Sequence, residues 1–372
     1  MGLSGAVAEA ARTFRVGGEI VGIVAVPGGH INETYRVDVR GAGGVARSYL
    51  LQRLNPLVFR RPDLVIENVV RVSRHVELAA RASGRPSPVA PLVATDHGAD
   101  WLADSAGGVW RMFVFVVGTV MREHARSAGD CAAAGRAFGA FLALLAGWDG
   151  PPLHETIPGF HDTRARLRQL DAAARADVAG RAGDAGAEVA AIRAERSLAD
   201  VIPPLIASGE IPIRVTHNDA KLSNVLLDAR TGTERCVVDL DTVMPGSALY
   251  DFGDLVRSTV SPTAEDEEDV SRVAVREEYF DALARGYVET AGAVLRPREL
   301  ELLAFAGRLV TLEQAARFLT DHLQGDTYYR IERPGHNLGR CRAQLALLRS
   351  LTAQAAALER IVARLASAVS RS

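Results

Sequence analysis

Lysine is almost missing from this chain of 372 residues. All but one of its 43 basic residues are arginine, and the exception is Lys221. Lysine carries a compact point charge on a flexible stem, whereas arginine presents a planar fork of donors. A single lysine among so many arginines predicts a position where the chemistry requires an ammonium group.

Other scarce features exclude whole classes of protein. The three cysteines, Cys131, Cys236 and Cys341, are too scattered for a disulfide framework or a paired metal motif. A formal charge of −2 gives no electrostatic case for nucleic acid or an anionic membrane as partner. Residues 1–11 lack the basic region of a signal peptide, and the longest apolar run, 137–146, is shorter than the about 20 residues of a membrane span. We expect a protein of the reducing cytoplasm, either a monomer or a weak homodimer.

The residue pattern changes near position 118. Before it, β-branched and alternating runs predict strands at 20–26, 34–39, 49–54, 100–103 and 109–117, with a helix over 62–81. After it, long helical patterns dominate, with short strands at 213–216 and 236–240, and the acidic run 261–269 is typical of a helix N-terminus. This order predicts an α+β, bilobal fold with a β-rich lobe over 1–117 and a helical lobe over 118–372.

Lys221 lies in the segment 216–224, which reads THNDAKLSN. Within it His217, Asp219 and Asn224 repeat the spacing of a kinase catalytic loop. Phosphoryl transfer mainly requires positioning and neutralisation of charge. The spacing therefore predicts Asp219 as the base, Asn224 as a ligand of Mg²⁺, and Lys221 as the cation on the transferred phosphoryl group.

A second metal carboxylate has two candidates. Asp251-Phe252-Gly253 spells the kinase metal-binding triplet, but it follows Pro245-Gly246 and begins a helical pattern. Asp239 ends an apolar strand and is the better candidate for the second ligand of Mg²⁺. Asp251 is instead expected to support the catalytic loop by accepting backbone hydrogen bonds. Asp241 is expected on the same strand face as Asp239, as a further metal or substrate contact.

The first lobe offers candidate contacts to the nucleotide. Gly28 and Gly29 form a turn with Asn32, where backbone amides can approach phosphates. The strand lysine of kinases is absent, so Arg53 is the first candidate cation and its neighbour Gln52 the second. Glu67, on the next helix, is the expected ion-pair partner of Arg53. The alternative is that Arg53 and Glu67 form a surface pair of little energetic value.

These segments together resemble the aminoglycoside phosphotransferase and choline kinase superfamily, and within it the N-acetylhexosamine 1-kinase group. The resemblance implies a protein-kinase-like fold and transfer of phosphate from ATP, with Mg²⁺, to the anomeric hydroxyl of a free sugar. It also implies that His30, Arg317 and Tyr328 contact the sugar, beside Asp219 and Asp241. The motifs that carry it are 29–35, 51–55, 67–68, 216–226, 238–246, 250–254, 317–321, 328–329 and 333–338.

Two alternatives are kept. An antibiotic phosphotransferase of the aminoglycoside type would need an acidic pocket, yet the expected substrate segment 307–345 holds more arginines than acidic residues. A nucleotide-binding pseudokinase would normally have lost the base or a metal ligand, but Asp219, Asn224 and Asp239 are all present. The choice between ATP and GTP is left open.

Overall fold

The computed structural model describes residues 5–26, 32–56 and 58–369. It divides into two compact units. The first holds residues 1–119 together with two later segments, 150–157 and 236–244. The second holds the remaining residues of the chain.

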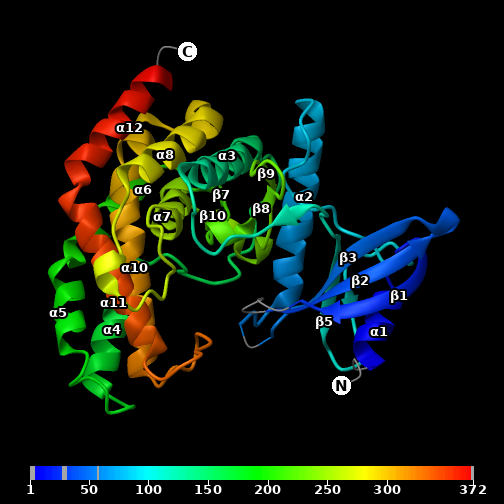
Figure 1. Cartoon of the computed structure of the whole chain (residues 1–372), viewed down its shortest axis with the longest axis horizontal. Coiled ribbons are helices and arrows are strands. Elements are labelled where there is room, and N and C mark those ends of the chain that lie inside the picture. Colours follow the sequence, from blue (N-terminus) through cyan, green and yellow to red (C-terminus); the bar gives the residue numbers. More distant parts are fainter. Residues whose placement is uncertain (1–4, 27–31, 57, 370–372) are drawn as a thin grey trace. The chain divides into compact units, whose positions relative to one another are not determined.

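The first unit is built on an antiparallel sheet in the order β1-β2-β3-β5-β4, drawn in blue and cyan in Figure 1. The alternating side chains of its strands bury one face, where Val37, Leu51 and Trp110 pack with residues of the N-terminal helix α1. The long helix α2 begins at Pro62, which suits the first turn because proline lacks an N–H donor. The elements are α1 (Gly5–Arg12), β1 (Gly18–Ala25), β2 (Glu33–Gly41), β3 (Ala46–Arg53), α2 (Pro62–Ala82), β4 (Leu102–Ala103) and β5 (Val109–Val114).

Asn68 of α2 joins the two inserted segments to the first unit. Its side chain accepts the backbone N–H of His154 and donates to the carbonyls of His154 and Val243 at 2.8 and 3.0 Å. Asn68 is itself buried, and its bond to Val243 is fully buried, whereas the two bonds to His154 are partly buried. The segment that carries Asp239 is thereby fixed to α2.

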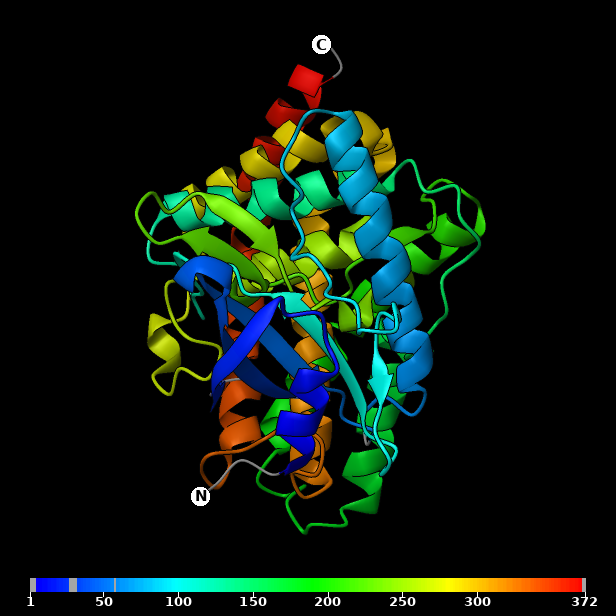
Figure 2. The ribbon, with the colours of Figure 1, turned by 90° about the vertical axis from the view of Figure 1, so that its right-hand side faces the viewer.

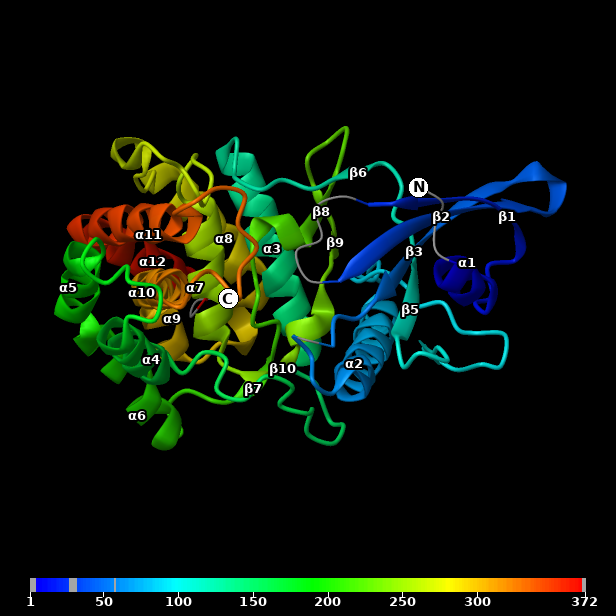
Figure 3. The ribbon, with the colours of Figure 1, turned by 90° about the horizontal axis from the view of Figure 1, so that it is seen from below.

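The second unit is a helical bundle around α10. Figure 3 shows α10 among α4, α7, α11 and α12, and Figure 2 shows α3 and α8 side by side. Gly135 of α3 lies so close to the α8 backbone that a side chain there would strike the carbonyl of Leu283. The helices are α3 (Ala128–Leu145), α4 (Thr163–Ala176), α5 (Gly186–Ala194), α6 (Ile202–Ala207), α7 (Ala248–Thr259), α8 (Glu277–Ala291), α9 (Pro297–Glu301), α10 (Leu303–Leu323), α11 (His336–Ala353) and α12 (Ala355–Val369).

Short strands surround the predicted catalytic segment. They are β6 (Thr119–Val120), β7 (Arg214–Thr216), β8 (Val225–Asp228), β9 (Glu234–Val237) and β10 (Met244–Gly246). β7 ends directly before His217, and β8 begins directly after Asn224. The loop between them is therefore anchored by a strand at each end.

Two expectations about the elements need correction. The acidic run 261–269 is made of turns and bends and is not a helix. Its carboxylates pair instead with arginines of other segments, as Glu265 does with Arg257 and Asp266 with Arg333. The strand expected over 236–240 already ends at Val237, because residues 240–242 form the short 3₁₀ helix η4 (Leu240–Thr242).

One helix of the described chain, α3, is long and apolar enough to cross a membrane by length and composition. Most of its apolar window is buried inside the second unit, where the helix packs on α8. This is the usual position of a core helix, so the feature is weak evidence for a membrane span.

Candidate active site

The catalytic segment brings Asp219, Lys221 and Asn224 together in the second unit. The Lys221 ammonium lies 2.9 Å from Asp219 Oδ2. Asn224 Nδ2 donates to the backbone carbonyl of Asp219 at 2.8 Å and to Asp219 Oδ2 at 3.0 Å. The side chains of Asp219 and Lys221 each retain about a quarter of their exposure, 26% and 28%. The carboxylate is thus oriented by two side chains and still reachable from outside.

The charge of Asp219 is set by opposing effects. Burial raises the pKa of its carboxyl, but the charges of Lys221 and His217 and the hydrogen bond from Asn224 outweigh that effect and lower the pKa well below its ordinary value. Asp219 is therefore ionised at neutral pH. An ionised carboxylate that accepts hydrogen bonds can orient an acceptor hydroxyl and take its proton.

Asp251 supports the loop from α7, as the sequence predicted. Its Oδ2 accepts the backbone N–H of His217 at 2.9 Å, and its Oδ1 accepts that of Asn218 at 2.7 Å. Asn218 has a left-handed backbone with φ of 62°, which asparagine tolerates better than most residues. Burial raises the pKa of the Asp251 carboxyl, against the lowering effect of His217 and the two N–H donors. Asp251 is thus a buried support of the loop.

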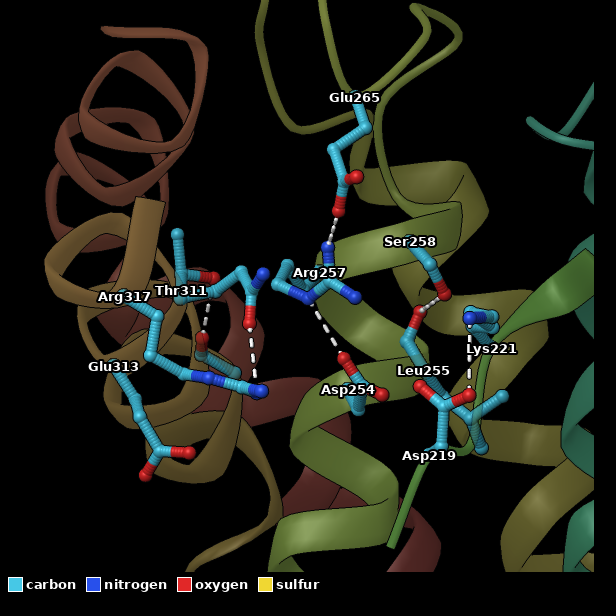
Figure 4. Close-up of polar contacts among 12 residues, drawn as sticks. Asp219, Lys221, Asp254, Leu255, Arg257, Ser258, Glu265, Thr311, Glu313 and Arg317 are labelled. Carbon is cyan, nitrogen blue, oxygen red and sulfur yellow. Dashed lines mark hydrogen bonds and ion pairs between the residues drawn. The ribbon is translucent and has the colours of Figure 1, made fainter. Parts of the chain in front are cut away.

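Sequence reasoning missed a chain of charges beside this loop. Asp254 and Arg257 lie one turn apart on α7, and Arg257 Nε donates to Asp254 Oδ1 at 2.7 Å. Arg257 also pairs with Glu265, as Figure 4 shows. Burial, together with the charge of Asp219, raises the pKa of Asp254, although Arg257 and Lys221 act in the other direction. The spacing of three residues between Asp254 and Arg257 was the only sequence signal for this pair.

The two expected metal ligands, Asn224 and Asp239, fall in different units. Asn224 uses its amide N–H₂ on Asp219, which leaves the carbonyl oxygen as the atom suited to Mg²⁺. Asp239 belongs to the first unit and has a left-handed backbone, with φ of 61° and ψ of 58°. Such strain in a residue with a side chain is concentrated at functional sites. Among the described residues no group of three His, Cys, Asp or Glu side chains forms a metal cluster.

Asp241 differs from its expectation. It is 3% exposed, it lies in η4, and it forms an ion pair with Arg111 of β5, whose side chain is 1% exposed. Asp241 Oδ2 also accepts from Asn32 Nδ2 at 2.6 Å. A strand face shared with Asp239 does not exist, because β9 ends before both residues. Within the first unit Asp241 is thus buried and paired, and its contact with a metal ion or the substrate stays a prediction.

The pairing of Arg53 with Glu67 is also wrong. Arg53 lies opposite Glu33 in the β2–β3 register, and their charged groups are 3.3 Å apart. Glu67 pairs with Arg71, one helical turn further along α2, and with His154 at 3.0 Å. The pairing register of β2 with β3 places Arg53 beside Glu33, and a single sequence does not determine how two strands are aligned.

The remaining nucleotide candidates have local partners. Gln52 accepts two bonds from Arg111, at 3.1 and 2.9 Å. Asn32 Oδ1 accepts the backbone N–H of Asn55 at 3.1 Å, so Asn32 connects β2, β3 and η4. Gly28, Gly29 and His30 lie outside the described residues.

Arg317 and Tyr328, the expected sugar contacts, both belong to the second unit. The Arg317 guanidinium lies over the rings of Phe160 and Tyr329, at 5.0 and 5.8 Å, and donates to Gln314 at 3.1 Å. Burial lowers the pKa of Arg317, but Tyr329, Tyr328, Glu313 and Asp219 together raise it above its ordinary value. Tyr328 is 56% exposed. The Asp219 carboxylate is thus close enough to contribute to the raised pKa of Arg317.

A buried carboxylate holds the segment that carries Tyr328. Asp321 of α10 accepts the backbone N–H groups of three successive residues at 2.8 to 2.9 Å. It also accepts from Asn337 of α11 at 2.9 Å. These bonds satisfy the N–H groups of the turn and stabilise it. The exposed Tyr328 ring therefore belongs to a rigid segment. The three donors are Thr327, Tyr328 and Tyr329.

Solved structures with the same fold cover nearly the whole chain. An amicoumacin kinase in complex with AMP-PNP, Ca²⁺ and Ami shares 14% identity, with a TM-score of 0.58 and coverage of 92% of this chain and 93% of that one. A microcompartment-associated aminopropanol kinase shares 16%, with a TM-score of 0.57 over 95% and 98%. A choline/ethanolamine kinase family protein from Mesorhizobium loti shares 18%, with a TM-score of 0.52 over 97% and 98%.

The family model of the phosphotransferase enzymes matches residues 22–297. This range includes most of the sheet of the first unit, from the middle of β1 onward, the catalytic segment and α7 with Asp251. The fold is the bilobal, kinase-like fold expected from the sequence, with a β-sheet lobe and a helical lobe. The chain belongs to the phosphotransferase enzyme family.

Proposed function

We propose that this protein is an ATP-dependent sugar 1-kinase, which transfers the γ-phosphate to the anomeric hydroxyl of an N-acetylhexosamine or a related hexose. The arrangement of Asp219, Lys221 and Asn224 carries the phosphotransferase part of the proposal. The choice of a sugar rests on the resemblance to the N-acetylhexosamine 1-kinase group.

Asp219 acts as the base in this proposal. The acceptor oxygen forms a bond to the γ-phosphorus as the bond from phosphorus to the ADP oxygen breaks, and the hydroxyl proton passes to Asp219. Asn224 keeps the carboxylate in one orientation. With a lowered pKa, Asp219 contributes mainly by orienting the hydroxyl, and it receives the proton late, when the bond to phosphorus is largely formed and the hydroxyl proton has become acidic.

Lys221 supplies the positive charge. In the structure its ammonium forms an ion pair with Asp219. Because the lysine side chain is flexible, its rotation would move the ammonium to a phosphoryl oxygen of a bound nucleotide. Arginine at this position would keep the charge but impose a wider, planar group. This explains why a chain that otherwise uses only arginine retains a lysine here.

Two residues carry ligand types that suit a divalent metal ion. Asn224 and Asp239 would hold Mg²⁺, through an amide oxygen and a carboxylate, the ligand types that this hard cation prefers. When bound, the ion neutralises charge on the β- and γ-phosphates. Arg53, 36% exposed at its side chain, stays the first candidate for a nucleotide phosphate, since Gln52 Nε2 already donates to Thr34 Oγ1 at 3.3 Å. Gly28, Gly29 and Asn32 are the proposed backbone contacts.

For the sugar, we propose contacts from Arg317, Tyr328 and His30. The exposed ring of Tyr328, on its rigid turn, offers an apolar face for a pyranose and a hydroxyl for hydrogen bonding. Arg317 offers donors to ring hydroxyls or to an acetamido carbonyl.

An antibiotic phosphotransferase is the runner-up. The solved neighbours include an amicoumacin kinase, a spectinomycin phosphotransferase and three proteins named as aminoglycoside phosphotransferases. The guanidinium of Arg317, beside the exposed Tyr328, disfavours a polycationic acceptor by charge repulsion. A pseudokinase is disfavoured because the base and its oriented partners are intact.

A coupled assay of ADP release would test the acceptor. Purified protein with ATP and Mg²⁺ is given N-acetylglucosamine, N-acetylgalactosamine, plain hexoses, aminoglycosides and spectinomycin in turn. The proposal predicts the highest kcat/KM with an N-acetylhexosamine, and loss of the signal in an Asp219→Asn control. Turnover only with an antibiotic would establish the runner-up, and ATP binding without any transfer would establish the pseudokinase.

A further inference from the structure

His161 and Glu313 form a buried pair directly behind the catalytic segment. His161 precedes α4 and Glu313 belongs to α10, and their side chains are 8% and 2% exposed. The imidazole stacks on the ring of Tyr250 from α7, with centroids 4.8 Å apart and planes 4° apart. Neither residue takes part in the chemistry proposed above, yet His161 contacts the loop that carries the base, and Glu313 contacts His161.

The imidazole of His161 lies between two acceptors. Its Nε2 is 3.0 Å from the backbone carbonyl oxygen of Asn218, and its Nδ1 is 2.8 Å from Glu313 Oε1. A carbonyl only accepts hydrogen bonds, so Nε2 carries a hydrogen. A neutral imidazole has one N–H, and its Nδ1 would then turn a lone pair toward the carboxylate. The doubly protonated imidazolium satisfies both contacts, while Thr163 donates to the other oxygen of Glu313 at 2.6 Å.

The charges around His161 favour the same state. Glu313 and Arg317 face it from α10, and Asp251, Asp254 and the Tyr250 ring face it from α7. Three carboxylates against one guanidinium stabilise a positive imidazole. Burial lowers the pKa of His161, but Glu313 and Asp254 raise it above its ordinary value of 6.5. Burial raises the pKa of Glu313, but His161 and Arg317 lower it overall.

We propose that His161 is a positioning residue that acts as a buried imidazolium, paired with Glu313, and holds the carbonyl of Asn218 directly before the base. Asp251 holds the N–H of the same residue. The N–H and the carbonyl of Asn218 are thus both hydrogen-bonded, which stabilises its left-handed conformation. This conformation determines the direction of the backbone, and so the orientation of the next residue, Asp219. The proposal rests on the proposed role of Asp219 as the base. It predicts that kcat falls at alkaline pH, when the imidazolium of His161 loses its proton.

The first test is ¹⁵N NMR of protein labelled at histidine, with the His161 signals assigned by their loss in His161→Gln. Both ring nitrogens of His161 are expected to be protonated at pH 7.5, above the ordinary pKa of histidine. One unprotonated ring nitrogen at that pH would overturn the proposal. This measurement needs no acceptor, so it stands apart from the identity of the substrate.

The second test is the pH profile of kcat with any acceptor that is phosphorylated. In His161→Gln with Glu313→Gln, two amides replace the ion pair and keep a donor on Asn218 without a titrating group. We expect this double variant to lose the alkaline fall in kcat while KM for ATP is unchanged. Glu299→Gln is the matched control, since it breaks a buried pair with Arg214 at 2.7 Å in the same unit and should keep the fall. An alkaline fall retained in the double variant would refute the proposal, and if that variant does not fold, the NMR result decides.

Discussion

Asp251 Oδ1 accepts the backbone N–H of Asn218 at 2.7 Å across 33 residues of sequence. The contact explains why an Asp-Phe-Gly triplet in this chain is not the metal-binding triplet of kinases. The carboxylate is buried and already holds two N–H groups of the catalytic segment. Asp251 therefore affects catalysis indirectly, by holding the backbone of the catalytic loop in position.

Asp251→Asn should therefore damage both stability and turnover. The asparagine oxygen can accept one N–H, but its NH₂ group faces the other N–H and leaves it without an acceptor. A buried donor without a partner costs about 1–3 kcal/mol. Urea denaturation should show this loss, together with a lower kcat in the folded variant. Wild-type stability and kcat would show that the loop does not depend on Asp251.

Asp219→Asn should lower kcat by more than about 100-fold, within the range of a lost general base. The amide keeps the size of the side chain and removes the proton acceptor. Steady-state kinetics provide the measurement, and nucleotide binding by calorimetry shows that the variant is intact. Near-normal turnover would remove Asp219 from the role of base.

Lys221→Arg tests whether the single lysine is required for its shape. The charge is retained, but the planar group cannot take the place of an ammonium that moves between Asp219 and a phosphoryl oxygen. We expect a reduced kcat with little change in thermal stability, because the side chain is partly exposed. An unimpaired variant would show that any cation suffices.

Gly246→Ala should disturb the loop by steric contact. A Cβ at Gly246 would strike the side chains of Thr216 and Asn218, which bond to one another at 3.1 Å. Gly147→Ala is the control, because a Cβ there meets no atom within 4 Å. Reduced kcat and melting temperature are expected for the first variant alone. Equal behaviour of the two would contradict this packing.

Arg111→Met tests the buried pair of the first unit. It leaves Asp241 as an uncompensated buried charge, which typically costs about 3–5 kcal/mol. Arg53→Met, at a partly exposed pair with Glu33, should change stability by about 1 kcal/mol or less. Chemical denaturation of both variants gives the comparison, and a similar loss in each would refute the structural role of Arg111.

Stability should also depend on pH through His161. Its folded-state pKa is raised, so its stabilising effect is complete below the ordinary pKa of 6.5 and is lost as pH rises through the folded-state value. Urea unfolding between pH 6 and 9 should show a steeper alkaline loss for wild type than for the variant with glutamine at 161 and 313. If the free energy of unfolding depends on pH in the same way in both proteins, the alkaline loss of stability comes from a group other than His161.

The sequence predicted those parts of the protein that depend on local pattern. The strand runs and the helix from Pro62 were found because period and turn residues determine them. The support role of Asp251 was also predicted, from its place at the start of a helix after the loop. The Arg53–Glu67 pair was wrong because strand register placed Glu33 opposite Arg53. The pairs Arg111–Asp241 and His161–Glu313 were missed because each joins residues more than a hundred positions apart.

The most direct measurement is ³¹P NMR of the products formed from ATP, Mg²⁺ and N-acetylhexosamine. The account predicts a new phosphomonoester signal coupled to the anomeric proton of the sugar, and its absence with Asp219→Asn. A phosphate on any other hydroxyl, or on an antibiotic alone, would contradict the proposed sugar 1-kinase.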